Sequence, residues 1–225
     1  MLQKATIDFL LELHDNNTRD WFDENRKRYQ VAKIDVEQFA DAIINQLSHH
    51  DTSLAMLTGK SCLFRINRDV RFSNDKSPYK TNMGFWMNKG GKKSPSAGYY
   101  VHIEPNGKSF LAGGIYMPMP PDLKKVRTEI LYDFDTFKAI VENDAFLAQF
   151  KTVAVEGHKT SRVPQGFDSA HPSAEYLKLK SFIGATPLSD TDLMQEGIVA
   201  NIVKGLSQAS PLVHFVNRAF DIGEE

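Results

Sequence analysis

The stretch Tyr99-Tyr-Val-His-Ile-Glu104-Pro-Asn-Gly107 decides the fold that this sequence predicts. Up to residue 104 its odd-numbered residues are apolar or aromatic, and its even-numbered residues are Tyr100, His102 and Glu104. This alternation has the period of a strand with one buried and one wetter face. The Pro-Asn-Gly that follows is typical of a tight hairpin turn. We therefore expect a β-hairpin whose second strand runs from Ser109 to Tyr116.

The neighbouring segments extend this hairpin to a sheet. Thr81–Met87 and Cys62–Asn67 also show strand patterns, and short successive connections imply an antiparallel meander. Gly113-Gly114 inside the last strand indicates a bulge or a close approach by another backbone. Two further segments, Thr152–Val155 and Leu177–Ile183, are weaker strand candidates.

Helical periodicity lies on both sides of the sheet. Apolar spacing predicts N-terminal helices over about 6–14, 18–29 and 36–49, with Thr6 as the first N-cap and either Thr18 or Asn17 as the second. Later helices are expected from Leu123, Phe134 and Asp192. Helices around a run of strands indicate an α+β fold. We predict one domain over 1–225, with an antiparallel meander sheet of about four to six strands at 60–118. Helical parts at 1–50 and 120–225 flank this sheet core.

Composition restricts the classes of function. The 225 residues are 41% hydrophobic and 24% charged, with a formal net charge of −1, which disfavours broad contact with nucleic acid. The single cysteine, Cys62, excludes an internal disulfide framework and a multi-cysteine zinc site. No apolar run approaches the roughly 20 residues of a membrane helix. We expect a cytoplasmic protein, and its cofactors and oligomeric state stay open.

A charged stretch before the second strand is the first candidate site. It reads Arg65-Ile-Asn-Arg68-Asp69-Val-Arg71-Phe-Ser-Asn-Asp75-Lys76-Ser-Pro-Tyr79-Lys80-Thr81. Guanidinium groups suit carboxylates and phosphates, and lysines add point charges. The expected partner is a small phosphorylated or carboxylated ligand. Its predicted binding residues are Arg65, Arg68, Arg71, Lys76, Tyr79 and Lys80, with Arg19 and Trp21 at the rim.

The polar strand face supplies candidates for catalysis. Tyr100 and His102 would act as general acid or base if they lie near the ligand, and Asp69 is a third candidate. A solvated face of a half-exposed sheet explains the same pattern. The remaining histidines have no spacing that forms a metal site, so we expect no metal.

Two other interpretations of the charged stretch remain open. Asp69 and Asp75 could pair with the arginines and form a purely structural network. Alternatively, the basic stretch could join the lysines at 89, 92 and 93 in a surface for nucleic acid or protein, beside Tyr79 and Trp86. The partners of the guanidinium groups distinguish these interpretations.

Several motifs together resemble one known family. They are Asn16-Asn17-x-Arg19-x-Trp21-Phe22, the stretch Arg65–Lys80, Tyr100-x-His102-Ile-x-Pro, Gly113-Gly114-x-Tyr116-x-Pro118, Arg127, and Arg162-x-Pro-x-Gly166-Phe. On these motifs the chain resembles the domain of unknown function 2461 family, a group of conserved hypothetical proteins. The resemblance covers nearly the whole chain. It implies an α+β fold and implies no activity, substrate or cofactor.

Overall fold

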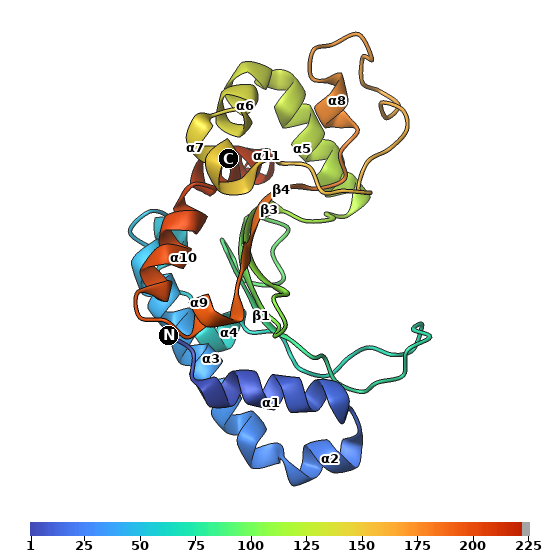
Figure 1. The fold of residues 1–225 in the computed structure, drawn as a ribbon. Helices are drawn as coiled ribbons and strands as arrows, with labels where there is room; N and C mark the ends of the chain where they lie inside the picture. The colour runs from blue at the N-terminus through green and yellow to red at the C-terminus, as the bar shows by residue number, and fades with distance from the viewer. Residues whose placement is uncertain (222–225) are drawn as a thin grey trace. The chain divides into compact units, whose positions relative to one another are not determined.

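The computed structural model describes residues 1–221, and it has an α+β fold built on a four-stranded sheet (Figure 1). The strands are β1 (Met83–Asn88), β2 (Gly98–Ile103), β3 (Ser109–Ile115) and β4 (Phe182–Leu188). They lie in the order β1-β2-β3-β4. Each strand therefore pairs with the next one in the sequence, and the predicted antiparallel meander is confirmed.

The hairpin turn between β2 and β3 is also confirmed. Asn106 and Gly107 both have positive φ, at 66° and 70°, which is the backbone that Asn-Gly favours in a two-residue hairpin. The carboxylate of Asp190 accepts hydrogen bonds from both backbone N–H groups, at 2.8 and 3.1 Å. This turn holds the polar residues of β2 in the register that the alternation predicts.

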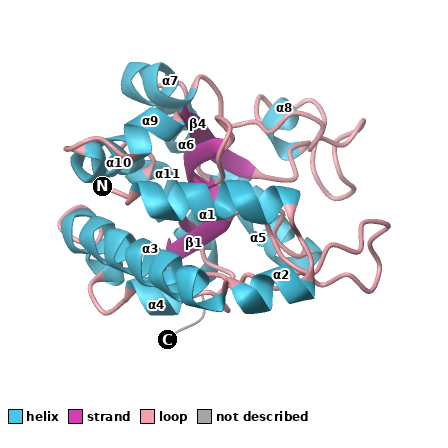
Figure 2. Ribbon diagram, turned by 60° about the horizontal axis from the view of Figure 1, so that its bottom comes forward, coloured by secondary structure: helices cyan, strands magenta, loops and turns pink. Residues whose placement is uncertain are grey.

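The described chain forms two compact units, and the first contains residues 1–87, 100–111 and 187–204. Its helical elements are α1 (Lys4–Asp15), α2 (Arg19–Glu24), α3 (Arg26–Leu47), the 3₁₀ turn η1 (Thr52–Leu54), α4 (Gly59–Cys62), α9 (Asp190–Leu193) and most of α10 (Ile198–Ser207). Helices α1 and α3 pack against each other (Figure 2). Phe39 of α3 meets Phe85 of β1 edge to face, with ring centroids 6.5 Å apart, so α3 covers the buried face of this part of the sheet.

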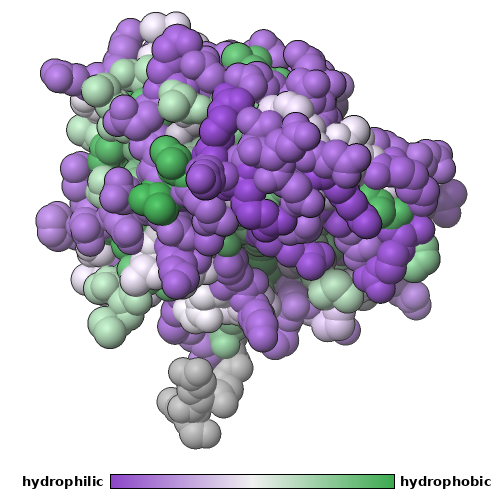
Figure 3. Space-filling view, turned by 90° about the horizontal axis from the view of Figure 1, so that it is seen from below, coloured by the Kyte–Doolittle hydropathy of each residue, from purple (hydrophilic) through white to green (hydrophobic). Residues whose placement is uncertain are grey.

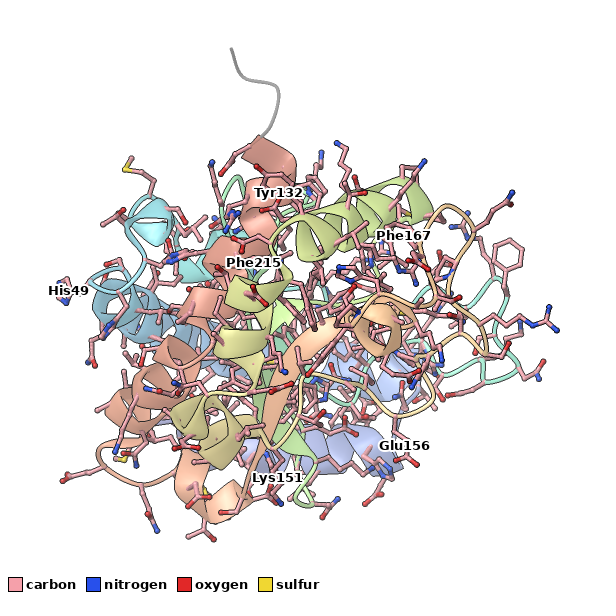
Figure 4. All side chains as sticks on the ribbon, turned by 90° about the horizontal axis from the view of Figure 1, so that it is seen from above. His49, Tyr132, Lys151, Glu156, Phe167 and Phe215 are labelled. Carbon is pink, nitrogen blue, oxygen red and sulfur yellow. The ribbon has the colours of Figure 1, made fainter. Side chains whose placement is uncertain are left out.

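The second unit contains residues 88–99, 112–186 and 205–221. Its helices are α5 (Pro120–Tyr132), α6 (Phe134–Val141), α7 (Asp144–Phe150), α8 (Ala174–Leu177) and α11 (Ser210–Asp221). Phe137 is fully buried, and its ring contacts Tyr176, Phe182 and Phe215, the last of which is labelled in Figure 4. Gly114 has φ 130°, and a Cβ there would lie 2.0 Å from the backbone oxygen of Phe182. The close backbone approach predicted for this glycine is therefore confirmed.

The strand predicted over Cys62–Asn67 is wrong. Thr58 and Ser61 form a capping box that starts the short helix α4, and this helix continues to Cys62. Beyond it the chain pairs with the β1 side only at two isolated bridges, Leu63 with Phe85 and Asn67 with Tyr79. Helix α4 therefore replaces the start of the predicted strand, and the remaining residues form isolated bridges in place of a continuous strand.

Other boundaries differ from the prediction as well. Thr152–Val155 is not a strand, and Leu177 ends α8, so that β4 begins only at Phe182. Thr6 lies inside α1, and its hydroxyl donates to Asp35 at 2.5 Å instead of capping the helix. The cap at Thr18 is confirmed, because its side chain accepts from the backbone N–H of Trp21.

Within residues 1–221, no helix combines the length and the apolar character that a bilayer crossing requires. The face seen in Figure 3 carries mainly hydrophilic residues, and its hydrophobic residues form small separate groups.

Candidate functional site

The charged stretch forms a loop between α4 and β1 that projects away from the helices of the first unit (Figures 1 and 2). Its tip is open to solvent, since Phe72 is 96% exposed. Its two ends pair with each other: Arg68 N–H donates to the Pro78 carbonyl at 2.9 Å, and Lys80 N–H donates to the Ile66 carbonyl at 2.8 Å. The loop therefore has a base, where the backbone of residues 66–68 pairs with that of residues 78–80, and a tip, residues 69–77, between these ends.

Tyr79 anchors the base of this loop in the core. The residue is 8% exposed, and its ring stacks on Phe22 with centroids 3.8 Å apart. The Asn17 side chain accepts from the Tyr79 N–H at 3.1 Å and donates to the Tyr79 carbonyl at 2.9 Å. These contacts assign a structural role to a residue that the sequence placed among the ligand-binding groups.

The backbone of Arg68 belongs to the paired base, and its side chain bonds to residues of the loop tip. Its guanidinium forms an ion pair with Asp75 and also donates to the Ser77 carbonyl at 3.2 Å. The hydroxyl and the backbone N–H of Ser77 both donate to Asp75, at 2.6 and 2.9 Å. The Ser77 bonds, followed by the bond from Arg68, lower the pKa of Asp75 to about 2. The carboxylate therefore stays ionised and keeps Arg68 occupied.

Arg71 and Lys76 are bonded within the tip as well. The Nε and Nη2 of Arg71 donate to the two carboxylate oxygens of Asp69, at 2.9 and 2.6 Å. These bonds lower the pKa of Asp69 and raise that of Arg71. Lys76 Nζ donates to the Val70 carbonyl at 3.0 Å. Asp69 is therefore engaged by an arginine and is a poor candidate for a catalytic base.

The cations at the base of the loop are different. Within residues 1–221, neither Arg65 nor Lys80 forms an ion pair or a side-chain hydrogen bond with a carboxylate. Burial, and then the neighbouring charge of Arg65, lower the pKa of Lys80. Lys80 Nζ lies 5.6 Å from the ring centroid of Phe64. Arg65 and Lys80 are therefore neighbouring cations, and Lys80 lies over the aromatic ring of Phe64.

A chain of three hydrogen-bonded side chains lies on the half-exposed face of β2. The Tyr100 hydroxyl is 3.0 Å from His102 Nδ1, and His102 Nε2 is 2.9 Å from a carboxylate oxygen of Glu104. Because a carboxylate accepts, Nε2 carries the proton of the neutral ring and Nδ1 accepts from the tyrosine. Burial, and then the charge of Glu104, raise the pKa of Tyr100 to about 12. The phenol therefore keeps its proton at neutral pH.

Aromatic rings and one glycine position this chain. His102 stacks on Phe110 with centroids 4.8 Å apart, and Phe64 meets Tyr100 edge to face at 6.3 Å. A Cβ on Gly84 would lie 2.1 Å from the Tyr100 hydroxyl oxygen, so glycine makes room for the phenol. Phe64 therefore contacts both Lys80 and Tyr100, and it joins the cationic pair to the polar chain.

A comparison with known protein families decides where the chain belongs. The model of the family described as conserved hypothetical protein (DUF2461) matches residues 5–215. The chain belongs to the DUF2461 family. No curated protein and no solved structure matches it. The resemblance seen in the sequence motifs is confirmed, and family membership assigns no activity to the site.

The predicted rim residues of this DUF2461 protein, Arg19 and Trp21, do not contact the hydrogen-bonded side chains Tyr100, His102 and Glu104. Arg19 is exposed at the start of α2, and Trp21 stacks on Phe9 with centroids 5.9 Å apart. Across the described residues, no hydrogen bond or ring contact joins either of them to Lys80 or Tyr100. Trp21 thus packs onto α1, and Arg19 has no observed role.

Sequence reasoning missed three residues of the site. Phe64 and Gly84 contact Tyr100, and the Thr81 hydroxyl lies 3.4 Å from Glu104. Phe64 was assigned to a strand that does not form, and nothing in the sequence pairs Gly84 with Tyr100. A long-range contact of this kind becomes visible only in the folded sheet.

The described residues contain no group of three or more His, Cys, Asp or Glu side chains arranged to hold a metal ion. His49, for example, is exposed and points away from the ribbon in Figure 4.

Proposed function

We propose that this DUF2461 protein binds a small anionic ligand, a phosphorylated or carboxylated molecule, at Arg65 and Lys80. One observation carries the proposal: neither of these two neighbouring cations forms an ion pair or a hydrogen bond with a carboxylate within residues 1–221, whereas the other two arginines of the loop each form an ion pair. The charge of Arg65 also helps to lower the pKa of Asp69, but that carboxylate is bonded to Arg71. Like charges at short range disfavour each other, and partial burial disfavours the charge on Lys80 further. An anion bound between Arg65 and Lys80 would offset the repulsion between the two cations and would stabilise the partly buried charge of Lys80.

In this proposal the strand-face chain supplies a proton to the bound ligand. With His102 neutral, the Tyr100 hydroxyl donates to Nδ1 and only its oxygen lone pairs face other groups. With a proton on both ring nitrogens, Nδ1 donates to the tyrosine oxygen, and the hydroxyl hydrogen is directed to a nearby anion. Transfer of that hydrogen to the ligand would be balanced by transfer of the Nδ1 proton to the tyrosine oxygen, so the phenol stays protonated and the imidazole becomes neutral.

An interaction surface for a protein or a single-stranded nucleic acid is the second candidate. The observation in its favour is Phe72, which is almost fully exposed at the loop tip and has the Arg71 guanidinium 5.9 Å from its ring centroid. Exposed aromatic rings beside arginine are typical of stacking platforms. The cytoplasm is the proposed compartment, because the sequence has a single cysteine and therefore no internal disulfide, which is usual for proteins of a reducing compartment.

The test is a thermal-shift series with inorganic phosphate, glycerol phosphate and succinate, each compared with sodium chloride at equal ionic strength. A ligand at 100 times its dissociation constant adds about 2.7 kcal/mol of stability. We expect a shift in the wild type that disappears in Lys80→Met. Lys76→Met is the matched control, because among the described residues Lys76 bonds to one carbonyl of its own loop and to no other group.

An equal shift in both lysine variants, or no shift with any of the three anions, would reject the proposal. Binding of a short oligonucleotide that is lost in Phe72→Ser and kept in Lys80→Met would favour the second candidate.

A further inference from the structure

The second unit contains an arginine with an unusual environment. Arg127 lies on α5 and is 8% exposed. Its Nη2 donates to the Leu179 carbonyl at 2.8 Å, in the segment between α8 and β4. Its Nε is buried and has no hydrogen-bond partner among the described residues. A buried guanidinium thus uses one backbone acceptor and leaves a strong donor unsatisfied.

Arg127 also lacks a counter-charge within residues 1–221. None of the ion pairs of this part of the chain includes it, and burial alone lowers its pKa. Two acids that follow it in the sequence are occupied: Glu129 and Asp133 pair with Arg218, at 2.7 and 2.9 Å. Buried charges in proteins are normally paired, since an unpaired one is costly to desolvate. Arg218 therefore has two acidic partners, whereas the more buried Arg127 has no acidic partner among the described residues.

The exposed loop of the same protein shows what such a guanidinium edge accepts. Arg71 presents Nε and Nη2 together to the two oxygens of one carboxylate. Arg127 has the same two nitrogens, with one bond from Nη2 to a carbonyl and none from Nε. This edge suits a planar carboxylate or two oxygens of a phosphate.

Other polar groups lie on the same segment as the Leu179 carbonyl. Ser181 is fully buried, and its hydroxyl oxygen accepts from the Met117 N–H at 3.0 Å. The same oxygen is 3.5 Å from Nδ1 of His158, a residue of the irregular segment between α7 and α8. Met117 has a positive φ of 45°, which is uncommon for a residue with a side chain. A serine, a histidine and an arginine therefore border one short stretch, Leu179–Ser181.

We propose that Arg127 is the charged centre of a second binding site, in the second unit, for a small oxyanion carried by a phosphate or a carboxylate. Ser181 and His158 are hydrogen-bonding groups at the same segment, Leu179–Ser181, whose Leu179 carbonyl accepts from Arg127. This site does not include Arg65 or Lys80, and the proposal for it does not depend on the ligand site proposed at those two residues.

The direct test observes Arg127 in the wild-type protein, so that no variant has to fold. The ¹⁵N–¹H signal of its Nε is followed during titration with inorganic phosphate and with succinate, each against sodium chloride at equal ionic strength. Arg127→Lys assigns the signal, since it removes that resonance and keeps the charge. We expect a saturating shift of this signal with one of the two oxyanions, and the one that acts names the chemical class.

An Nε signal that moves with neither oxyanion, or that moves as much with chloride, would overturn the proposal. The titration is repeated in Lys80→Met, which removes a cation of the first site. A response of Arg127 that persists there shows that the second site acts by itself. Loss of the response would mean that the signal reports the first site, and the proposal would fall.

Discussion

The tip and the base of the loop between α4 and β1 have similar charges and opposite environments. At the tip, the side chains of Arg68 and Arg71 each form an ion pair with an aspartate of the loop. At the base, Arg65 and Lys80 lie near each other without such an ion pair among the described residues, and Lys80 is partly buried. The comparison teaches that the density of charge in a sequence does not identify a binding site. What matters is which charges the fold leaves without a partner.

The largest expected effect separates two aromatic residues of the loop, Tyr79 at the base and Phe72 at the tip. Tyr79→Ala should destabilise the protein by about 3–5 kcal/mol, the usual loss for a buried aromatic side chain, because its ring stacks on Phe22. Phe72→Ala should change the free energy of unfolding by less than about 0.5 kcal/mol, since Phe72 is exposed. Urea denaturation of both variants measures the difference. Similar losses in both would show that the tip is packed in solution.

The next effect tests the position of Tyr100. Gly84→Ala places a methyl group 2.1 Å from its hydroxyl oxygen, so either the ring or β1 must move. We expect a loss of about 1–3 kcal/mol, as for other overpacked sites. Adding Tyr100→Ala should make the Gly84→Ala substitution nearly neutral, and a double-mutant cycle measures this coupling. Additive losses would contradict the contact.

A pH titration sharpens the contrast for Lys80. Because its pKa is lowered in the folded state, the folded protein releases this proton before the unfolded one does. Stability without ligand should therefore rise as pH increases through the folded pKa, while phosphate affinity falls over the same range. Both trends should be absent in Lys80→Met. Phosphate affinity that stays constant across this range would show that the Lys80 charge does not contribute to binding.

The smallest effect concerns Asp75 at the tip. Its pKa is lowered to about 2, so its bonds to Ser77 and Arg68 should be intact above the ordinary pKa and should be lost as pH falls toward about 2. The Ser77 backbone amide signal reports this change. Asp75→Asn should leave the phosphate affinity at neutral pH unchanged. A large loss of affinity in this variant would bring the tip into the binding site.

The fold could be predicted because local patterns decide most of it. The alternation in β2 and the Asn106-Gly107 turn specify the hairpin, and the short connections specify the meander. The strand expected over Cys62–Asn67 failed at its first residue, because the helix that the Thr58 capping box starts at Gly59 continues to Cys62. The residues after it form only isolated bridges, at Leu63 and Asn67. The alternation of the predicted strand was real, but the capped helix decided the backbone at its start.

The site was only partly predictable. Period-two spacing correctly placed Tyr100, His102 and Glu104 on one face, where they bond in sequence. The pairing of Arg68 with Asp75, seven residues away, depends on the path of the loop. The unsatisfied Nε of Arg127 depends on Glu129 and Asp133 pairing with Arg218. No spacing rule in the sequence distinguishes paired cations from unpaired ones.

The most direct test compares two exposed arginines of the same loop by calorimetric titration with inorganic phosphate. Arg65→Gln and Arg71→Gln remove the same charge, and only the second arginine forms an ion pair with a carboxylate among the described residues. We predict that Arg65→Gln weakens phosphate binding at least about tenfold, the loss of one charge-assisted contact, and that Arg71→Gln leaves it unchanged. Equal affinities in the two variants would contradict the conclusion that unpaired cations mark the site.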